Sequence, residues 1–144
     1  MQLPFWLKPR WFVPALALLG GGIYSALPSP PALCLSLQRF GAVETGGRCV
    51  VKGDVKLEGA VKRLPDHLTV QGNLRLNGTQ IVELPVALIV EGDLFLYKTG
   101  IGKLPADLTI GGNFDPYGGF GSPGIRCDDI PPSVVIKGQR NCNT

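Results

Sequence analysis

Apolar and polar residues alternate along the middle of the chain. Between Leu68 and Leu76 every second residue is apolar or glycine, and Thr, Gln, Asn and Arg stand between them. The same alternation returns between Leu88 and Leu96. A period of two residues is the pattern of a β-strand with one buried face. Glycine holds the middle inward position of both stretches, where it weakens a strand and often marks a bend. We therefore predict strands that turn a corner at this glycine.

These strands belong to a repeat of about 20 residues. Equivalent glycines in VKGD, VQGN, VEGD, IGGN and IKGQ are Gly53, Gly72, Gly92, Gly112 and Gly138. A fixed period of this size is typical of a solenoid. An isoleucine and a Leu-Pro step follow the alternating stretch and supply further inward side chains. One unit cannot bury its apolar side alone, but stacked units share a continuous core. The pattern predicts a β-rich repeat solenoid, a parallel stack of four to five coils.

Two copies of the repeat carry a family resemblance. The segments LRLNGTQIVELP and LFLYKTGIGKLP resemble the leucine-rich repeat, particularly the short 20-residue bacterial form with LPxxL openings. The resemblance covers roughly residues 50–136 and implies a leucine-rich-repeat-like binding scaffold with no catalytic activity. Thr79 and Thr99 stand where the family usually has Asn, whose side chain bonds the turn backbone. A flatter parallel β-solenoid is therefore the alternative architecture.

The N-terminal segment has the order of an export signal. MQLPFWLKPR carries two positive charges, residues 11–27 carry none, and PSPP follows. This is the order of a secretory signal. We predict a hydrophobic helix in residues 1–27 as a signal peptide or membrane anchor, a linker and N-terminal cap in 28–46, and the solenoid with its C-terminal cap in 47–144. Cleavage, retention as an anchor and an ordinary buried helix remain open alternatives. Export places the body outward, as a periplasmic, secreted or membrane-anchored protein.

The four cysteines agree with an oxidising compartment. Cys34 and Cys49 are 15 residues apart, and so are Cys127 and Cys142. An even count in an exported chain indicates disulfides, for which three connectivities exist. Local pairing would staple the two ends of the array, and four reduced thiols are the alternative. The repeat register also places Cys127 and Cys142 at core positions of adjacent coils, where they could meet.

The distribution of charge argues against a nucleic-acid partner. The net charge is +3, and from Val50 onward ten basic residues balance ten acidic ones. A neutral body offers no electrostatic footprint for a phosphate backbone.

Candidate binding residues lie in outward columns of the second strand of each coil. One column contains Lys56, Arg75, Phe95 and Asp115, and its neighbour contains Glu58, Asn77, Tyr97 and Tyr117. Equivalent residues of stacked coils lie ~4.8 Å apart, so that the two tyrosines could stack. Exposed aromatic side chains are suitable anchors for a protein or glycan. A six-residue insertion within residues 114–127 is the second candidate, through Tyr117 and Phe120, because repeat insertions often map to the binding face.

The remaining patterns favour structure over chemistry. Asp54, Asn73, Asp93 and Asn113 each follow a repeat glycine, and bonding to the backbone of the bend suits them better than calcium, which needs six or more oxygen ligands. No catalytic constellation, metal site or cofactor motif is evident, so an enzyme is not expected. A structural envelope or surface component without a specific ligand is the alternative to a binding scaffold.

Overall fold

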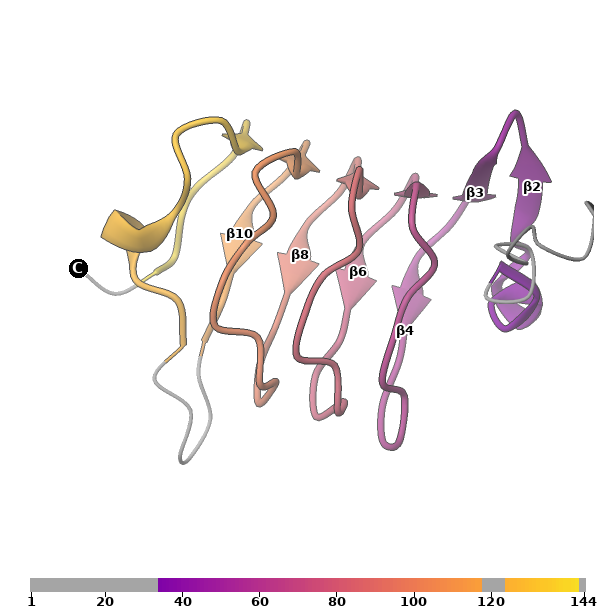
Figure 1. The fold of residues 1–144 in the computed structure, drawn as a ribbon, viewed down its shortest axis with the longest axis horizontal. Coiled ribbons are helices and arrows are strands. Elements are labelled where there is room, and N and C mark those ends of the chain that lie inside the picture. Colours follow the sequence, from indigo (N-terminus) through magenta and orange to yellow (C-terminus); the bar gives the residue numbers. More distant parts are fainter. Residues whose placement is uncertain (1–33, 118–123, 143–144) are drawn as a thin grey trace, which may run out of the picture.

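The computed structural model describes residues 34–117 and 124–142, which form a parallel β-solenoid of about three turns (Figure 1). The parallel β-solenoid was the alternative prediction, and it describes the structure. The elements in chain order are η2 (Gln38–Phe40), β2 (Val43–Thr45), β3 (Arg48–Val51), β4 (Val55–Lys56), β5 (Leu68–Val70), β6 (Leu74–Arg75), β7 (Ile89–Val90), β8 (Leu94–Phe95), β9 (Thr109–Ile110), β10 (Phe114–Asp115), η3 (Cys127–Asp129) and β11 (Val135–Ile136).

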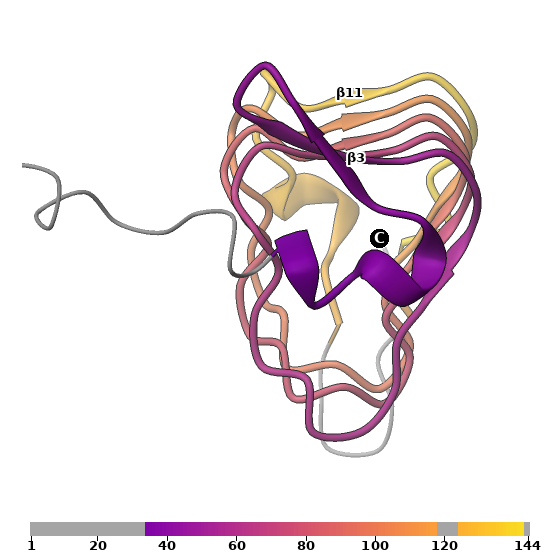
Figure 2. The same cartoon turned by 90° about the vertical axis from the view of Figure 1, so that its right-hand side faces the viewer.

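The strands form two sheets that run along the solenoid. The six-stranded sheet has the order β11-β9-β7-β5-β3-β2, and the four-stranded sheet has the order β10-β8-β6-β4. All pairs between coils are parallel, and only β2 and β3 form an antiparallel pair. Viewed along the axis, the coils superimpose closely (Figure 2). Four successive coils contribute one strand to each sheet, as β3/β4, β5/β6, β7/β8 and β9/β10, and β11 adds a strand to the six-stranded sheet alone. The coils close through a third, irregular side.

The inward positions of the repeat form one continuous core. Leu68, Val70, Leu74 and Leu76 are fully buried, as are their equivalents one coil later. Ile81 and Ile101 are also buried, as the repeat predicts. A fully buried aliphatic side chain contributes roughly 1.5–3 kcal/mol, so the copied leucines account for much of the cohesion between coils.

The bend between the two sheets is built by the repeat glycine and the Asp or Asn after it. A Cβ at Gly92 would lie 2.7 Å from the carbonyl oxygen of Gly72, so the backbones can approach only without side chains. Asn73 Oδ1 accepts the Asp93 N–H at 2.8 Å, and Asp93 Oδ1 accepts the Asn113 N–H at 2.7 Å. The same bond links Asp54 to Asn73 and Asn113 to Gln139. The predicted bonding to the bend backbone is confirmed, and each bond joins one coil to the next.

The threonines of the repeat turns serve the backbone in a similar way. Thr79 and Thr99 are buried, and their hydroxyls donate to the carbonyl oxygens of Leu76 and Leu96 at 2.9 Å. Each threonine therefore satisfies a carbonyl of its own turn.

The third side of each coil is held together less closely. It contains the Leu-Pro steps, and we refer to residues 61–66, 81–86 and 101–106 as the Leu-Pro side. Leu64, Leu84 and Leu104 are buried there, but within the described chain residues 82–84 and 102–104 make no backbone hydrogen bond. Grooves of about 390 and 370 Å³ separate the three segments.

A disulfide-linked cap closes the N-terminal end. Cys34 and Cys49 are bonded and buried, and Cys49 pairs in register with the buried Leu68. Arg48 ties the cap to two later coils: its Nε donates to Thr69 Oγ1 at 3.0 Å and its Nη2 donates to the Ala87 carbonyl at 2.7 Å. The cap is thus joined to the stack by a disulfide, a strand pair and one long side chain.

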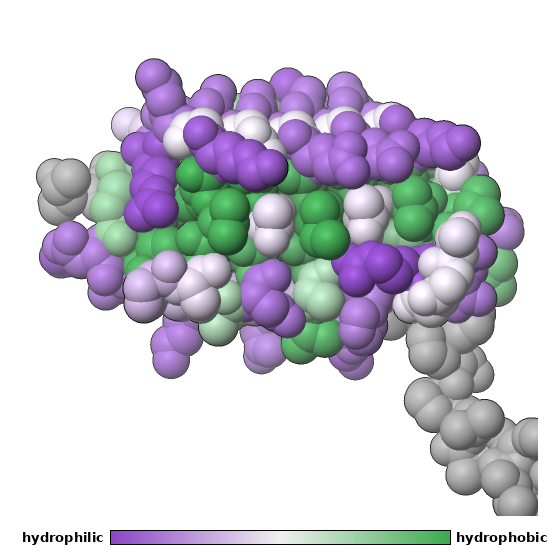
Figure 3. Space-filling view, turned by 90° about the horizontal axis from the view of Figure 1, so that it is seen from above, coloured by the Kyte–Doolittle hydropathy of each residue, from purple (hydrophilic) through white to green (hydrophobic). Residues whose placement is uncertain are grey.

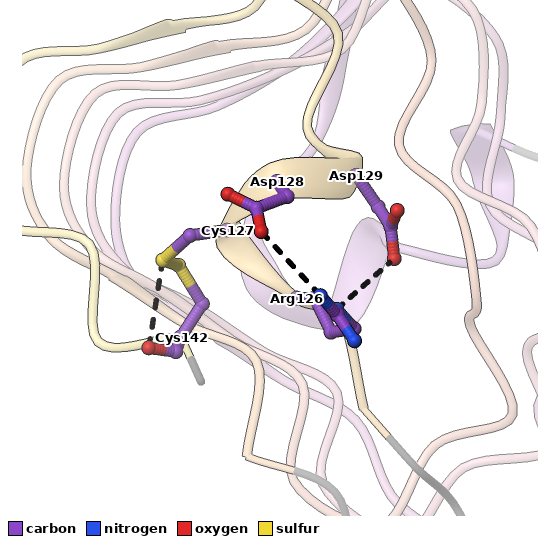
Figure 4. Close-up of polar contacts among 5 residues, drawn as sticks. All are labelled: Arg126, Cys127, Asp128, Asp129 and Cys142. Atoms are coloured by element: carbon purple, nitrogen blue, oxygen red, sulfur yellow. Dashed lines mark hydrogen bonds and ion pairs between the residues drawn. A yellow bond between two sulfur atoms is a disulfide. The ribbon is translucent and has the colours of Figure 1, made fainter. Parts of the chain in front are cut away.

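The C-terminal end differs in its exposure. Cys127 and Cys142 are bonded, as local pairing predicted, with exposed ion pairs from Arg126 to Asp128 and Asp129 beside them (Figure 4). Both cysteines are only half-buried, however, and Ile125 is buried near them. The prediction of core positions for Cys127 and Cys142 is therefore wrong in part, because among the described residues no further coil lies over them.

Two further predictions concern the number of coils and the N-terminal helix. Four to five coils were expected, whereas the structure contains about three complete turns, because the units at both ends are modified into caps. The predicted hydrophobic helix of residues 1–27 lies outside the described residues. No helix of residues 34–117 and 124–142 has the length and apolar character needed to cross a membrane.

Candidate binding surfaces

The first candidate surface is the outer face of the four-stranded sheet. Register pairing aligns Lys56 with Arg75, Arg75 with Phe95, and Phe95 with Asp115. The column predicted from the sequence therefore exists, with each residue contributed by a different coil. It runs down the outer side of strands β4, β6, β8 and β10, which Figure 1 shows in order along the solenoid.

Basic side chains pack on two of the predicted aromatic anchors. The guanidinium carbon of Arg75 lies 4.3 Å from the ring centroid of Phe95, and Lys98 Nζ lies 5.2 Å from that of Tyr97. Both distances suit a cation–π interaction, worth about 0.5–1 kcal/mol at an exposed site. Phe95 is therefore partly covered by Arg75 and is only half-exposed.

The two tyrosines remain open to solvent. Tyr97 is 43% exposed and Tyr117 is 62% exposed. Their backbones are fixed by carboxyl or amide side chains: Asn77 Oδ1 accepts the Tyr97 N–H at 3.0 Å, and Asp115 Oδ1 accepts the Tyr117 N–H at 3.4 Å. Among the described residues the two rings make no contact, so the expected tyrosine stack is not formed. Each ring is left as a separate exposed anchor on a fixed backbone.

The structure describes only part of the insertion loop. Tyr117 is its described beginning, whereas Phe120 lies outside the described residues. Along the chain the insertion falls between β10 and η3.

A second surface was missed in the sequence. The outward positions of the six-stranded sheet pair as Val43, Val50, Thr69, Ile89, Thr109 and Val135. Every member is β-branched, and from above a band in which apolar (green) and near-neutral (white) residues alternate lies between hydrophilic residues (Figure 3). Val43 is 58% exposed and Val135 is 45% exposed. We refer to these six residues as the β-branched row.

The row could have been found from the repeat alignment. Thr69 is a polar member of the row, and its equivalents in other coils are valine, isoleucine and threonine. Thr69 itself is buried, because the guanidinium of Arg48 lies against it. The row is therefore interrupted near the N-terminal cap and continuous from Ile89 to Val135.

Comparison with protein-family models, with characterised proteins and with solved structures finds no match to this chain.

Proposed function

We propose that the protein is a non-catalytic binding scaffold that presents the outer face of its four-stranded sheet to a protein or glycan. The observation that carries the proposal is the pair of exposed tyrosines, Tyr97 and Tyr117, beside the Arg75–Phe95–Asp115 column. Tyrosine offers a large apolar ring with a polar end at a small entropic cost, which suits recognition of a protein or a sugar.

The fixed geometry of the outer face of the four-stranded sheet supports this proposal. Backbone bonds from Asn77 and Asp115 fix the positions from which both rings project, and β-pairing fixes Phe95 between Arg75 and Asp115. A rigid surface loses little conformational entropy when a partner binds. Arg75 and Asp115 add one charge of each sign, which can orient a ligand across the aromatic residues.

We further propose that the protein acts outside the cytosol, exported or anchored through residues 1–27. Two disulfides at the two ends of the stack are consistent with an oxidising environment. The uncharged stretch of residues 11–27 supports the same assignment.

A paired comparison of variants tests the binding proposal. The Phe95→Ser/Tyr97→Ser variant is compared with Ile89→Ser/Val135→Ser, which alters the β-branched row of the other sheet. Binding is measured on a glycan array and by crosslinking to surface proteins of the source cells. We expect the first pair to lower ligand binding at least about tenfold and the second to leave it unchanged.

Three results separate the alternatives. Loss of binding only in Ile89→Ser/Val135→Ser would move the site to the β-branched row. A structural spacer without a specific ligand would be favoured if both variant pairs still captured a partner and kept the phenotype of the unchanged protein, whereas Leu76→Asp lost both the capture and the phenotype. Thermal unfolding of each variant shows whether a loss of binding reflects a loss of folding.

A further inference from the structure

The N-terminal end of the solenoid contains a groove that differs in charge from the rest of the molecule. Its volume is about 280 Å³, and it lies between the cap and the first coil. Leu37, Leu57 and Val61 give it apolar walls, and Arg39, Lys62 and Arg63 add three cations. No carboxylate of the described chain lines it. We refer to this feature as the cap groove.

The three cations of the cap groove are exposed and lack a carboxylate partner. The ion pairs of the described residues join Lys56 to Glu58 and Arg126 to two aspartates, and none includes Arg39, Lys62 or Arg63. Neighbouring cations repel one another, and a bound anion relieves that repulsion. The groove is therefore complementary to an anion that also has an apolar part.

An open strand edge lies beside the groove. At this end the six-stranded sheet is covered, because β2 pairs with β3, and Figure 2 shows the cap and this hairpin from the end. The four-stranded sheet ends in β4, which pairs with β6 on one side and with no described strand on the other. Leu57, which follows β4 directly, lines the groove. A strand edge presents unpaired N–H and C=O groups that an extended peptide can pair with.

We propose that the cap groove and the β4 edge bind an extended acidic peptide segment of another protein. The segment would pair with β4 through its backbone, place an aliphatic side chain against Leu37, Leu57 and Val61, and set carboxylates toward the three cations. The open edge favours a peptide over other amphipathic anions, because only a peptide backbone uses it. The chain's own N-terminal segment is a poor occupant, since residues 1–33 carry Lys8 and Arg10 and no acid.

The test uses the full-length protein and two fluorescein-labelled decapeptides. One alternates valine and glutamate, and the other alternates valine and lysine. Fluorescence anisotropy should show saturable binding of the Val-Glu peptide and none of the Val-Lys peptide. Lys62→Glu/Arg63→Glu should weaken the binding at least about tenfold. Lys103→Glu/Lys137→Glu is the matched control: it makes the same change of net charge at exposed positions outside the groove and should retain binding.

Strand pairing is tested with Val-Glu peptides that carry N-methyl groups on alternate amides. Methylation on the edge that faces β4 should abolish binding, and methylation on the opposite edge should retain it, because parallel or antiparallel pairing uses one edge only. Equal binding of both methylated peptides would overturn strand addition.

Four other results would overturn the proposal as a whole. They are no binding of the Val-Glu peptide, an equal loss in the control pair, binding of anionic phosphatidylglycerol vesicles without peptide binding, or self-association that disappears in Lys62→Glu/Arg63→Glu. The last two would assign the groove to lipid or to a second copy. Binding through the tyrosine face does not depend on Lys62 or Arg63, so the two proposals fail separately.

Discussion

The bend between the sheets and the Leu-Pro side belong to the same coils but are built differently. In the bend, glycine N–H groups bond across coils, as from Gly112 to Gly92 at 2.9 Å, and the Asp or Asn side chains add a second bond per step. On the Leu-Pro side of the described chain, cross-coil hydrogen bonds lie only at the ends of the segments, as from the Val86 N–H to Asp66 Oδ1 at 3.3 Å. Between those ends buried leucines hold the coils, Val82 remains exposed and grooves separate the segments. From this difference we expect the bend to tolerate few residue types and the Leu-Pro side to tolerate many.

The six-residue insertion agrees with this division. It falls between β10 and η3, and the glycine of the bend is retained on both sides of it as Gly112 and Gly138. Loop extension costs little where the ends are not held in register, since the closure entropy grows slowly with length.

The largest expected effect separates two glycines of the same coil. Gly92→Ala should lower the free energy of unfolding by about 3 kcal/mol, because its Cβ would meet the backbone of Gly72 at 2.7 Å. Gly102→Ala on the Leu-Pro side should leave it unchanged or raise it by about 0.5 kcal/mol, because its Cβ meets no atom within 4 Å. Urea unfolding measures both. Equal destabilisation by the two variants would show that the bend is no tighter than the Leu-Pro side.

A smaller effect is expected from the side-chain bonds of the bend. Asn73→Ala leaves the half-buried Asp93 N–H without its acceptor and should lower the free energy of unfolding by about 1–2 kcal/mol. Asp93→Asn retains an oxygen for the Asn113 N–H and should change the free energy of unfolding by less than about 0.5 kcal/mol. Glu83→Ala, on the Leu-Pro side, should change it by an equally small amount. If Asn73→Ala proves as mild as Glu83→Ala in urea unfolding, the side-chain bonds contribute nothing measurable.

The smallest effect concerns the turn that leads from the four-stranded sheet to the Leu-Pro side. Gly59 and Gly78 have left-handed backbones there, with φ of 78° and 71°, and Lys98 occupies the next equivalent position with φ of 57°. Lys98→Gly should raise the melting temperature by an amount corresponding to about 0.5 kcal/mol, since a left-handed conformation is strained for lysine. A fall in melting temperature would mean that the contact of Lys98 with Tyr97 outweighs the strain.

The sequence was sufficient for the features that repeat. The glycine spacing predicted the bend, the Leu and Ile positions predicted the core, and the Asp and Asn after each glycine predicted the backbone bonds. Each is specified by local geometry that every coil must satisfy. The column of Arg75, Phe95 and Asp115 was also predicted, because parallel stacking brings equivalent residues together.

Features that do not repeat were harder to predict. The half-exposure of Cys127 and Cys142 depends on their place at the end of the described stack, which the repeat register does not encode. The missing contact between Tyr97 and Tyr117 depends on side-chain rotamers, and Lys98 lies over one ring. The cap groove arises where the residues around Arg39 meet the first coil, a contact between segments of unrelated pattern.

Native-state hydrogen exchange of the full-length protein tests the central claim most directly. The claim is that hydrogen bonds fasten the coils closely at the bend, whereas residues 82–84 and 102–104 of the Leu-Pro side make no backbone hydrogen bond in the described chain. The amides of Asp93 and Asn113 should then be among the most protected, whereas those of Glu83 and Lys103, which have no backbone acceptor in the described chain, should exchange at least about a thousandfold faster. Equal protection of the two pairs, or faster exchange of Asp93 and Asn113, would contradict the account.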